Sequence, residues 1–561
     1  MSKTWIDRHR PRLDAAVAAS AARAYFSAFE ASPSGPSCAA ARRAGTAAFR
    51  SWLDEEFPVT TRGAEGTVAT ERSPFGFDLR VRYPRVVDVD ALLAPARGAR
   101  AWRDAGPDGR VGVCLEILDR LYDRGYEIAS AVRHTSGQPF GVAFSSSVAN
   151  TLDRSLEALA WSWEAQSRVA PTARWTRPGD GARGMEKTYT VIPRGTSLVI
   201  GSDVFPTWHA WPALFASLVA GNRVVVQPHP SAVLPLAITV QVCQEVLAEA
   251  GFDADLVALA VGDRADHLHE QLAVRPEVRI IDFTGPASCS GWLEERAGQA
   301  VLFTGSPGVN SVVLDSTDDF RALCDNLARS LALCTGQMTT APQNLLVPRA
   351  GIETDEGRKS PRDVADGLAA ALDRLLSDDE SAVEILGALA NPAVLESVEA
   401  AAKEGDVLIA SRRVIHPMYA DAEVHTPVLV GLQAVDADVY SGETLGAVCY
   451  LVETADTEES IALFYLMASR HGAVSASVYS TSPEVVAEVR DVALDVGVAL
   501  SENLLEGFVN TVSAFSDFYG AGASPSSGAT FLDAAFVAPR FRIAQSRRPM
   551  IREAPAGLSI S

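Results

Sequence analysis

Hydrophobic residues between positions 196 and 285 fall into short, nearly unbroken runs that alternate with longer apolar stretches. The short runs are rich in Val and Ile and end at Gly or Pro, which is typical of buried strands. Strands are expected at 196–201, 222–230, 256–262 and 278–285, and helices at 212–221 and 234–252. Strand–helix–strand units with apolar strands predict a parallel sheet that helices cover on both faces.

The same alternation resumes in the second half of the chain. Strands are expected at 310–315, 344–348, 446–453 and 473–480, and helices at 318–334 and 458–470. This second series predicts a second α/β domain. The first 110 residues carry the weakest pattern.

Charge and cysteine content limit the classes of partner. A formal net charge of −21 argues against nucleic acid or an anionic membrane surface as a partner. No apolar run reaches the length of a membrane span, and the first residues lack the apolar core of a signal peptide. Seven cysteines without a CxxC pair are typical of a reduced cytoplasm and argue against a metal site of the structural zinc type. We therefore expect a cytoplasmic protein that acts on a small molecule.

Several short motifs occur in a characteristic order. They are "FP" and "GN" within 196–230, "FTG" at 283–285, "GQ…AP" at 336–342 and "ETLG" at 443–446. In this order they resemble the aldehyde dehydrogenase superfamily. The phrases "HTSGQPF" (134–140), "GQMTTAPQNLLVP" (336–348) and "FVAPRFRIAQSRRP" (536–549) are most similar to the branch of the phenylacetic acid degradation protein PaaN. The similarity runs from about residue 110 to the end of the chain.

The resemblance implies a fold and its boundaries. The fold class would be α/β and aldehyde dehydrogenase-like, with two Rossmann-like parallel-sheet domains plus a small β oligomerisation arm. We expect an N-terminal helical region (1–110), a dinucleotide-binding-like domain (111–300), a catalytic-like domain (301–510) and a C-terminal return (511–561). Residues 174–195 and 534–549 resemble the arm and the C-terminal strand, and they imply a homodimer or a tetramer.

The family's nucleophile position holds an unusual residue. In the family motif G-Q-x-C, a cysteine attacks the carbonyl as a thiolate. This chain has Gln337, Met338 and then Thr339, so a threonine hydroxyl replaces the thiol. Cys334, five residues upstream, is the nearest alternative, but it continues the apolar stripe of the helix expected at 318–334. Two roles for Cys334 therefore remain open: a buried structural side chain and a catalytic nucleophile.

The general base and the oxyanion donor are also replaced. The family's glutamate falls on Gly305, and no carboxylate occurs between Arg296 and Asp315. The family's oxyanion asparagine falls on Val204, which has no side-chain donor. His209 lies nearby in sequence and is a candidate donor, although a packed structural histidine is the alternative.

Three of the positions that the resemblance assigns to the cofactor differ from the family. Gln227 stands where a ribose-binding lysine is usual, and Pro286 follows Gly285 where a serine is usual beneath the diphosphate. Glu443 keeps the carboxylate that holds the nicotinamide ribose, while Leu445 replaces a phenylalanine. We expect NAD or NADP binding to be weakened or absent. Cys289, near the start of the helix after "FTG", faces this groove and is a weaker thiol candidate than Cys334.

Three functions remain open at this stage. The first is a non-oxidative enzyme that acts on an aldehyde, acyl thioester or related intermediate, with polar groups such as His209, Thr339, Gln337 and His134 in its site. The second is an NAD(P)-dependent aldehyde oxidoreductase of phenylacetate degradation that uses Cys334. The third is a non-catalytic scaffold or binding protein. An aromatic substrate is compatible with candidate tunnel residues, which are Trp208, Trp211, Phe515, Phe518 and Tyr519.

Overall fold

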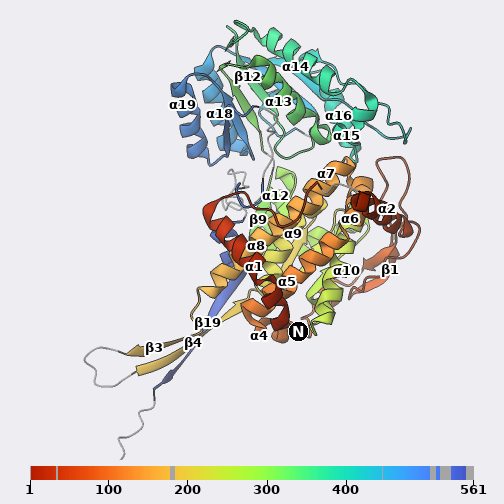
Figure 1. The fold of residues 1–561 in the computed structure, drawn as a ribbon, viewed down its shortest axis with the longest axis vertical. Helices are drawn as coiled ribbons and strands as arrows, with labels where there is room; N and C mark the ends of the chain where they lie inside the picture. Colours follow the sequence, from red (N-terminus) through yellow and green to blue (C-terminus); the bar gives the residue numbers. More distant parts are fainter. Residues whose placement is uncertain are drawn as a thin grey trace, which may run out of the picture.

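The computed structural model of the 561-residue chain describes residues 2–32, 36–176, 184–306, 308–444, 446–505, 513–518 and 532–550. Two α/β bodies lie one above the other, and a long β-arm projects from the lower one (Figure 1). The lower body contains the N-terminal helices together with the first sheet. The upper body contains the second sheet.

The first sheet has five parallel strands in the order β7-β6-β5-β8-β9. Its strands are β5 (Thr196–Ile200), β6 (Arg223–Gln227), β7 (Val257–Leu259), β8 (Val278–Thr284) and β9 (Val301–Gly305). The helices between them are α9 (Pro206–Val219), α10 (Leu234–Glu249), α11 (Leu268–Ala273) and α12 (Ala287–Arg296). The chain builds outward from β5 in one direction through β6 and in the other through β8. The sheet therefore has a topological switch point between β5 and β8, where ligands bind in open parallel sheets.

The second sheet has seven strands in the order β14-β15-β16-β12-β10-β17-β18. Its strands are β10 (Ser311–Leu314), β12 (Asn344–Pro348), β14 (Asp406–Ile409), β15 (Val428–Gln433), β16 (Val448–Thr454), β17 (Ala476–Tyr479) and β18 (Leu500–Glu502). All neighbours are parallel except the edge pair β14–β15. Its helices are α13 (Phe320–Ala332), α14 (Pro361–Leu375), α15 (Asp379–Leu386), α16 (Pro392–Ala401), α18 (Thr457–His471) and α19 (Pro483–Val496). The two parallel sheets confirm the predicted α/β fold class.

A layer of helices from the first part of the chain covers the first sheet. It comprises α1 (Ser2–Ala22), α2 (Pro36–Ser51), α5 (Gly106–Asp123), α6 (Gly125–Ser136), α7 (Phe140–Phe144) and α8 (Thr151–Ser167). Helix α1 packs against α5 and α8, and α8 packs against α9. Their apolar side chains join those of α9 and α10 in one core, which explains why α5 and α8 are buried on nearly every side. Two short strands, β1 (Ala64–Val68) and β2 (Tyr83–Val86), form a separate antiparallel pair.

The projecting arm is a three-stranded antiparallel sheet in the order β19-β4-β3. Strand β3 (Thr172–Thr176) and β4 (Gly184–Pro193) form a hairpin, and β19 (Phe541–Pro549) pairs with β4 along its whole length. The two segments that the sequence assigned to an arm are thus brought together. Ile543 on β19 and Trp175 on β3 are exposed on this arm.

Two of the helix boundaries that differ from the expectations bear on the site. Helix α9 begins at Pro206 rather than 212, because Pro206 occupies the first turn, where its missing N–H costs nothing. Helix α13 ends at Ala332 rather than 334, and Cys334 and Thr335 have left-handed backbone angles of φ 51° and 52°. Cys334 is therefore not on the helix whose apolar stripe it seemed to continue, although it is buried. Among the described residues, no helix is both long enough and apolar enough to cross a membrane.

Candidate functional site

A cavity of about 40 Å³ lies at the switch point of the first sheet. Its walls come from α8, the start of α9, the end of β8 and the C-terminal segment. The lining residues are Arg154, Trp208, His209, Pro212, Ala213, Asp282, Phe283, Thr284, Leu532 and Phe536. This is the position at which the topology of a parallel sheet predicts a ligand.

The loop between β5 and α9 is held in place by the end of α6 and the residues that follow it. Ser136 donates from its hydroxyl to the Asp203 carbonyl at 2.5 Å. Gln138 donates from Nε2 to the Val204 carbonyl at 2.6 Å, and its Oε1 accepts from Ser147 at 2.9 Å. Ser136 and Gln138 belong to the motif "HTSGQPF", and Ser147 follows it. Polar residues in an otherwise apolar stretch were the sequence signal that this motif positions the loop. They fix the backbone that presents α9 to the cavity.

His209 is the predicted site residue that the structure places in the cavity. Its Nδ1 lies 2.7 Å from the Ser202 hydroxyl, whereas its Nε2 is buried and has no hydrogen-bond partner among the described residues. Burial lowers the pKa of His209 to about 3, so the imidazole is neutral near pH 7. A neutral imidazole whose Nδ1 accepts a hydrogen bond from the Ser202 hydroxyl carries its own proton on Nε2, where it can act as a donor.

Arg154 is a cavity residue that the sequence did not single out. Its guanidinium donates from Nη1 to Glu157 at 2.9 Å and to the Asp517 carbonyl at 2.8 Å. Its Nη2 is buried and has no partner in the described part of the chain. The guanidinium carbon lies 5.6 Å from the ring of Trp208. The available signal was an Arg–Glu pair three residues apart on a helix, but an ordinary exposed pair shows the same pattern.

Asp282 on the cavity wall is fully engaged by a C-terminal arginine. Arg540 donates from Nη2 and Nη1 to the two carboxylate oxygens at 2.5 and 2.8 Å, and Nη1 also donates to the Ser217 hydroxyl at 2.6 Å. The Arg540 side chain is fully buried and lies between the rings of Phe303 and Phe536. This pair ties the end of the chain to β8 and leaves Asp282 with no net charge to offer a ligand.

The turn after α13 carries the residues that the resemblance assigns to catalysis. Burial raises the pKa of the Cys334 thiol to about 12, which disfavours a thiolate. Gln337 donates from Nε2 to the Cys334 carbonyl at 3.1 Å, so its amide serves the turn itself. Asn310 donates from Nδ2 to the Thr339 carbonyl at 2.8 Å and to the Ala341 carbonyl at 3.0 Å. None of these turn residues lines the cavity beside His209.

Gly305 occupies the end of β9, next to β8. It pairs with Thr284, and its carbonyl accepts from the Gly285 N–H at 3.0 Å. Thr284 lines the cavity, so the position that the resemblance assigns to the general base is one strand away from it. As a glycine, Gly305 supplies no side-chain base at this position. Among the described residues, the one carboxylate in the cavity wall is that of Asp282, which Arg540 neutralises.

The predicted cofactor residues gather at the ends of β6 and β8. Glu443 accepts from the Ala287 N–H at 3.3 Å through Oε2, at the first residue of α12, and Pro286 is the residue that caps this helix. Burial raises the pKa of Glu443 above its usual value. Gln227 donates from Nε2 to the Pro228 carbonyl at 3.0 Å, and its buried Oε1 has no partner among the described residues. Gly285 precedes Pro286, and Leu445 lies outside the described residues.

A dinucleotide fits these residues in part. A free amide oxygen on Gln227 suits a ribose hydroxyl donor, and a helix start suits a diphosphate. At α12, however, the N–H of Ala287 already donates to the Glu443 carboxylate, so a diphosphate would have to displace it.

The other polar and aromatic candidates have structural roles. His134 stacks on Phe49 at 4.7 Å and packs edge-on against Phe75, and burial lowers its pKa to about 3. Trp211 is fully buried and donates to the Thr239 hydroxyl at 2.9 Å, so it belongs to the core rather than to a tunnel.

The remaining tunnel candidates divide between the core, the surface and the cavity. Phe515 is buried against Phe26, and Phe518 is 43% exposed beneath Arg23. Tyr519 lies outside the described residues. Of the four aromatic candidates that the structure describes, Trp208 alone lines the cavity.

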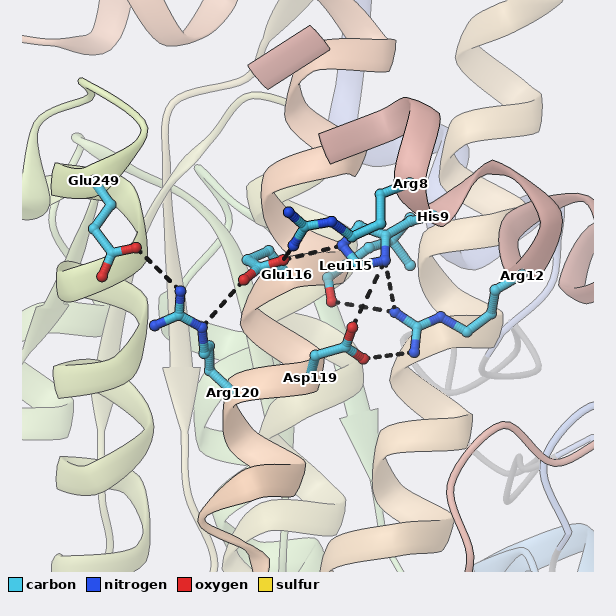
Figure 2. Close-up of polar contacts among 8 residues, drawn as sticks. All are labelled: Arg8, His9, Arg12, Leu115, Glu116, Asp119, Arg120 and Glu249. Carbon is cyan, nitrogen blue, oxygen red and sulfur yellow. Dashed lines mark hydrogen bonds and ion pairs between the residues drawn. The ribbon is translucent and has the colours of Figure 1, made fainter. Parts of the chain in front are cut away.

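One cluster of three potential metal ligands occurs in the described residues, where α1 meets α5 (Figure 2). It consists of His9, Glu116 and Asp119, whose ligating atoms lie within 4.8 Å of one another. Arginines already hold both carboxylates: Arg8 and Arg120 each donate to Glu116 at 3.1 Å, and Arg12 donates to Asp119 at 2.5 Å. Burial and Arg12 lower the pKa of His9. The cluster is therefore an ion-pair network that fixes α1 on α5, because the positive charges around it oppose a cation.

Comparison with known proteins places this geometry in a family. The model of the aldehyde dehydrogenase family matches residues 79–513. A crystal structure described as an NAD-dependent aldehyde dehydrogenase from Burkholderia multivorans is 44% identical, with a TM-score of 0.95 over 98% of this chain and 99% of that one. The N-succinylglutamate 5-semialdehyde dehydrogenase of Chromobacterium violaceum is 25% identical over 68% of this chain and 75% of its own. A Thermus 1-pyrroline-5-carboxylate dehydrogenase with bound NAD shares the fold, at 18% identity, with a TM-score of 0.70 over 94% of this chain and all of that one.

Proposed function

The chain belongs to the aldehyde dehydrogenase family, and from this premise we propose that it is an enzyme that acts on a small carbonyl compound without a thiol nucleophile. The reaction would be non-oxidative, on an aldehyde, an acyl thioester or a related intermediate. The cavity beside His209 would bind the substrate, with Trp208 against its apolar part.

The environment of the cysteines carries this proposal. Burial raises the pKa of five of the seven thiols, which are those of Cys114, Cys243, Cys324, Cys334 and Cys449. Cys334 is the thiol nearest in sequence to Thr339, and burial raises its pKa to about 12, which favours the neutral thiol at pH 7. Thr339, at the family's nucleophile position, carries an alcohol, which is far less acidic than a thiol and attacks a carbonyl only with the help of a strong base. The family's usual first step therefore lacks a nucleophile in this chain.

His209 would hydrogen-bond an oxygen of the substrate. Its side chain lines the cavity, its buried Nε2 has no partner among the described residues, and its pKa keeps it neutral, so it can donate or accept one proton at that atom. Trp208 and Phe283 give the cavity apolar walls, and such low-polarity surroundings strengthen a hydrogen bond. An open cavity with unpartnered polar atoms favours ligand binding over a purely structural role.

Dinucleotide binding is proposed to be weak. When bound, NAD would supply a hydride acceptor, and Gln227 and the start of α12 would hold it. Gln227 has no charge to pair with a 2′-phosphate, and Glu443 competes for the first N–H of α12. We expect NADP to bind more weakly than NAD, and calorimetry showing low-micromolar NADP binding would contradict this.

A second candidate is an NAD-dependent aldehyde dehydrogenase, which the comparisons favour. Its support is the 44% identity, over nearly the whole of both chains, to a structure with that description. The sequence resemblance to the PaaN branch would place such an activity in phenylacetate degradation. Cys334 or the exposed Cys289 would then have to supply the thiol.

One experiment distinguishes the two candidate functions by measuring which product forms and whether its formation needs NAD. The purified protein is incubated with a panel of aldehydes and acyl thioesters, with and without NAD, and the products are identified by mass spectrometry. The proposal expects a product at the oxidation level of the substrate, formed equally without NAD. A carboxylic acid formed only with NAD would replace the proposal by the second candidate.

A further inference from the structure

A cleft of about 600 Å³ lies where the two bodies meet. Helices α2, α6 and α7 of the lower body line one side of it, and α15 of the upper body reaches it from the other side (Figure 1). It shares no lining residue with the cavity beside His209. Small-molecule sites have volumes of roughly 300–1,000 Å³, so this cleft has room for a whole ligand.

Aromatic rings form one wall of the cleft. Tyr126 stacks on Phe144, with ring centroids 4.4 Å apart, and its ring lies parallel to that of Phe140 at 6.4 Å. Phe140 and Phe144 are buried, whereas Tyr126 is half-buried and keeps part of its surface accessible. Gly141 follows Phe140 on α7, and a Cβ added there would meet nothing within 4 Å beyond its own helix backbone. The wall therefore offers a partly aromatic surface with open space beside it.

One cation on this wall has no anionic partner. The guanidinium carbon of Arg42 lies over the ring of Phe140, 4.0 Å from its centroid. The Arg42 side chain is exposed and lines the cleft, and it forms no ion pair or hydrogen bond with any residue that the structure describes. The ring holds the guanidinium against the wall, which leaves its N–H groups available to an acceptor in the cleft.

The other charged lining residue, Glu384, lies close to a different arginine. Burial lowers the pKa of Arg133, and Glu384 opposes this shift while Arg42 adds to it, so both charges lie near the Arg133 guanidinium. Two cations therefore meet one carboxylate, which leaves positive charge in excess. Arg133 does not line the cleft and Arg42 does, so an anion can reach the excess charge at Arg42.

We propose that this cleft binds a small aromatic anion, with its acidic group on the N–H groups of Arg42 and its ring against Tyr126 and the apolar side chains beside it. A carboxylate and a phosphate share the chemistry that Arg42 recognises, because each can accept two hydrogen bonds from one guanidinium. The inference is independent of the proposed function, since it assigns no reaction to the cleft. A ligand here would contact both α7 and α15, and so would join the two bodies.

Cys38 lines the cleft and reports whether it is occupied. Cys38 is half-buried, Cys289 is exposed and the other five cysteines are buried, so alkylation by N-ethylmaleimide can be followed at these two thiols by peptide mass spectrometry. Saturating sodium 2-naphthoate is expected to slow alkylation of Cys38 in the full-length protein by at least about fivefold, because a bound ring covers most of the surface that it contacts. The rate at Cys289 should not change. An unchanged rate at Cys38, or equal slowing at both thiols, would overturn the proposal.

The charge of the ligand is tested with the neutral isostere 2-naphthamide and with 2-naphthyl phosphate. The concentration that halves the Cys38 alkylation rate is expected to be about threefold to tenfold lower for 2-naphthoate than for 2-naphthamide, because Arg42 favours a charged acceptor. Equal protection by these two probes would contradict an anion site. Stronger protection by the phosphate than by the carboxylate would support the site and identify a phosphate ester as its ligand, and the reverse order would identify an aromatic acid.

Variants of the two charged lining residues test the assignment of the anion. Arg42→Met keeps the stem over Phe140 and removes the charge, so protection by 2-naphthoate should need about threefold to tenfold more ligand, while 2-naphthamide is unaffected. Arg43→Met is the matched control, since Arg43 is exposed at the next position of α2 but does not line the cleft. Wild-type protection by 2-naphthoate in Arg42→Met would overturn the proposal. Glu384→Gln should leave protection by 2-naphthoate equal or stronger, and weaker protection would overturn it in favour of a zwitterion.

A variant that fills the cleft tests its position. Gly141→Leu places a side chain in the open space beside the aromatic wall and should abolish protection of Cys38 by both 2-naphthoate and 2-naphthamide. Gly291→Leu is the matched control, because Gly291 is also a helical glycine whose added Cβ would meet nothing, but it lies on α12 outside the lining. Full protection in Gly141→Leu would overturn the proposal. If Gly141→Leu does not fold, as judged by circular dichroism, Arg42→Met decides alone, since Arg42 is exposed.

Discussion

Replacing Arg540 by methionine removes the charged partner of a buried aspartate. The wild-type guanidinium makes four hydrogen bonds, two of them to Asp282 and the others to Ser217 and the Phe536 carbonyl at 3.0 Å. The Arg540 side chain is 0% exposed and that of Asp282 is 5% exposed. Removing one member of such a pair leaves an uncompensated charge and costs about 3–5 kcal/mol.

The cost should appear where the C-terminal segment meets the first sheet. If that segment opens as a unit, a loss of about 3–5 kcal/mol accelerates its amide hydrogen exchange by about two to four orders of magnitude. Hydrogen exchange with mass spectrometry on peptides that cover 536–549 measures this. The double change Arg540→Met with Asp282→Asn should recover part of the loss, because the unpaired charge is gone.

Arg548→Met serves as the control for this measurement. Arg548 also joins the C-terminal strand to the first half of the chain, through Glu186, but it is 79% exposed. Such a pair contributes at most about 1 kcal/mol. Exchange in Arg540→Met that matches Arg548→Met would refute the claim that the buried pair holds the C-terminal segment.

Three further predictions concern the pH dependence of stability, the restored catalytic groups and the oligomeric state. Burial raises the pKa of Glu71 to about 7, although the N–H groups of Val233 and Leu234 and the Tyr83 hydroxyl donate to it. The native state therefore keeps a proton that the unfolded state loses near pH 4.5, so stability should fall as pH rises from about 4.5 to 7, by up to about 1.4 kcal/mol per unit. Glu71→Gln should remove this slope in urea denaturation at several pH values, and an identical slope in both proteins would contradict the assignment. The double change Thr339→Cys with Gly305→Glu should create aldehyde oxidation or ester hydrolysis that neither single change creates, and activity in Thr339→Cys alone would show that another base is present. Light scattering should give the mass of a dimer or a tetramer of the 59.5 kDa chain, since the arm leaves Ile543 and Trp175 exposed. A monomer mass at micromolar concentration would be the contrary result.

The local pattern of apolar residues predicted much of the fold but few of the residues that line the cavity. The strands at 196–200, 223–227 and 278–284 follow from unbroken apolar runs, because a buried parallel strand has no polar face. The end of α13 at Ala332 did not follow, because Cys334 and Thr335 adopt left-handed angles that no residue type there announces.

The charged groups of the cavity depend on contacts far apart in the chain. Asp282 interrupts an apolar strand, and that anomaly signals a buried partner, but the partner lies 258 positions away at Arg540. Arg154 and Glu157 form a pair that an exposed helix would also show, and it is buried because α8 packs against α1, α9 and the C-terminal segment. His209 could be chosen from its place after "FP". Its orphaned Nε2 could not be foreseen, since it depends on which side chains surround it.

The rate of NADH formation from aldehydes tests the central claim most directly. Wild-type protein, Cys334→Ala and Cys289→Ala are assayed with NAD and an aldehyde panel. The account predicts that none of the three forms NADH above the enzyme-free rate, because the chain presents no thiolate to the carbonyl. NADH formation by the wild type that Cys334→Ala abolishes would contradict it, and would make a buried thiol with a raised pKa the nucleophile.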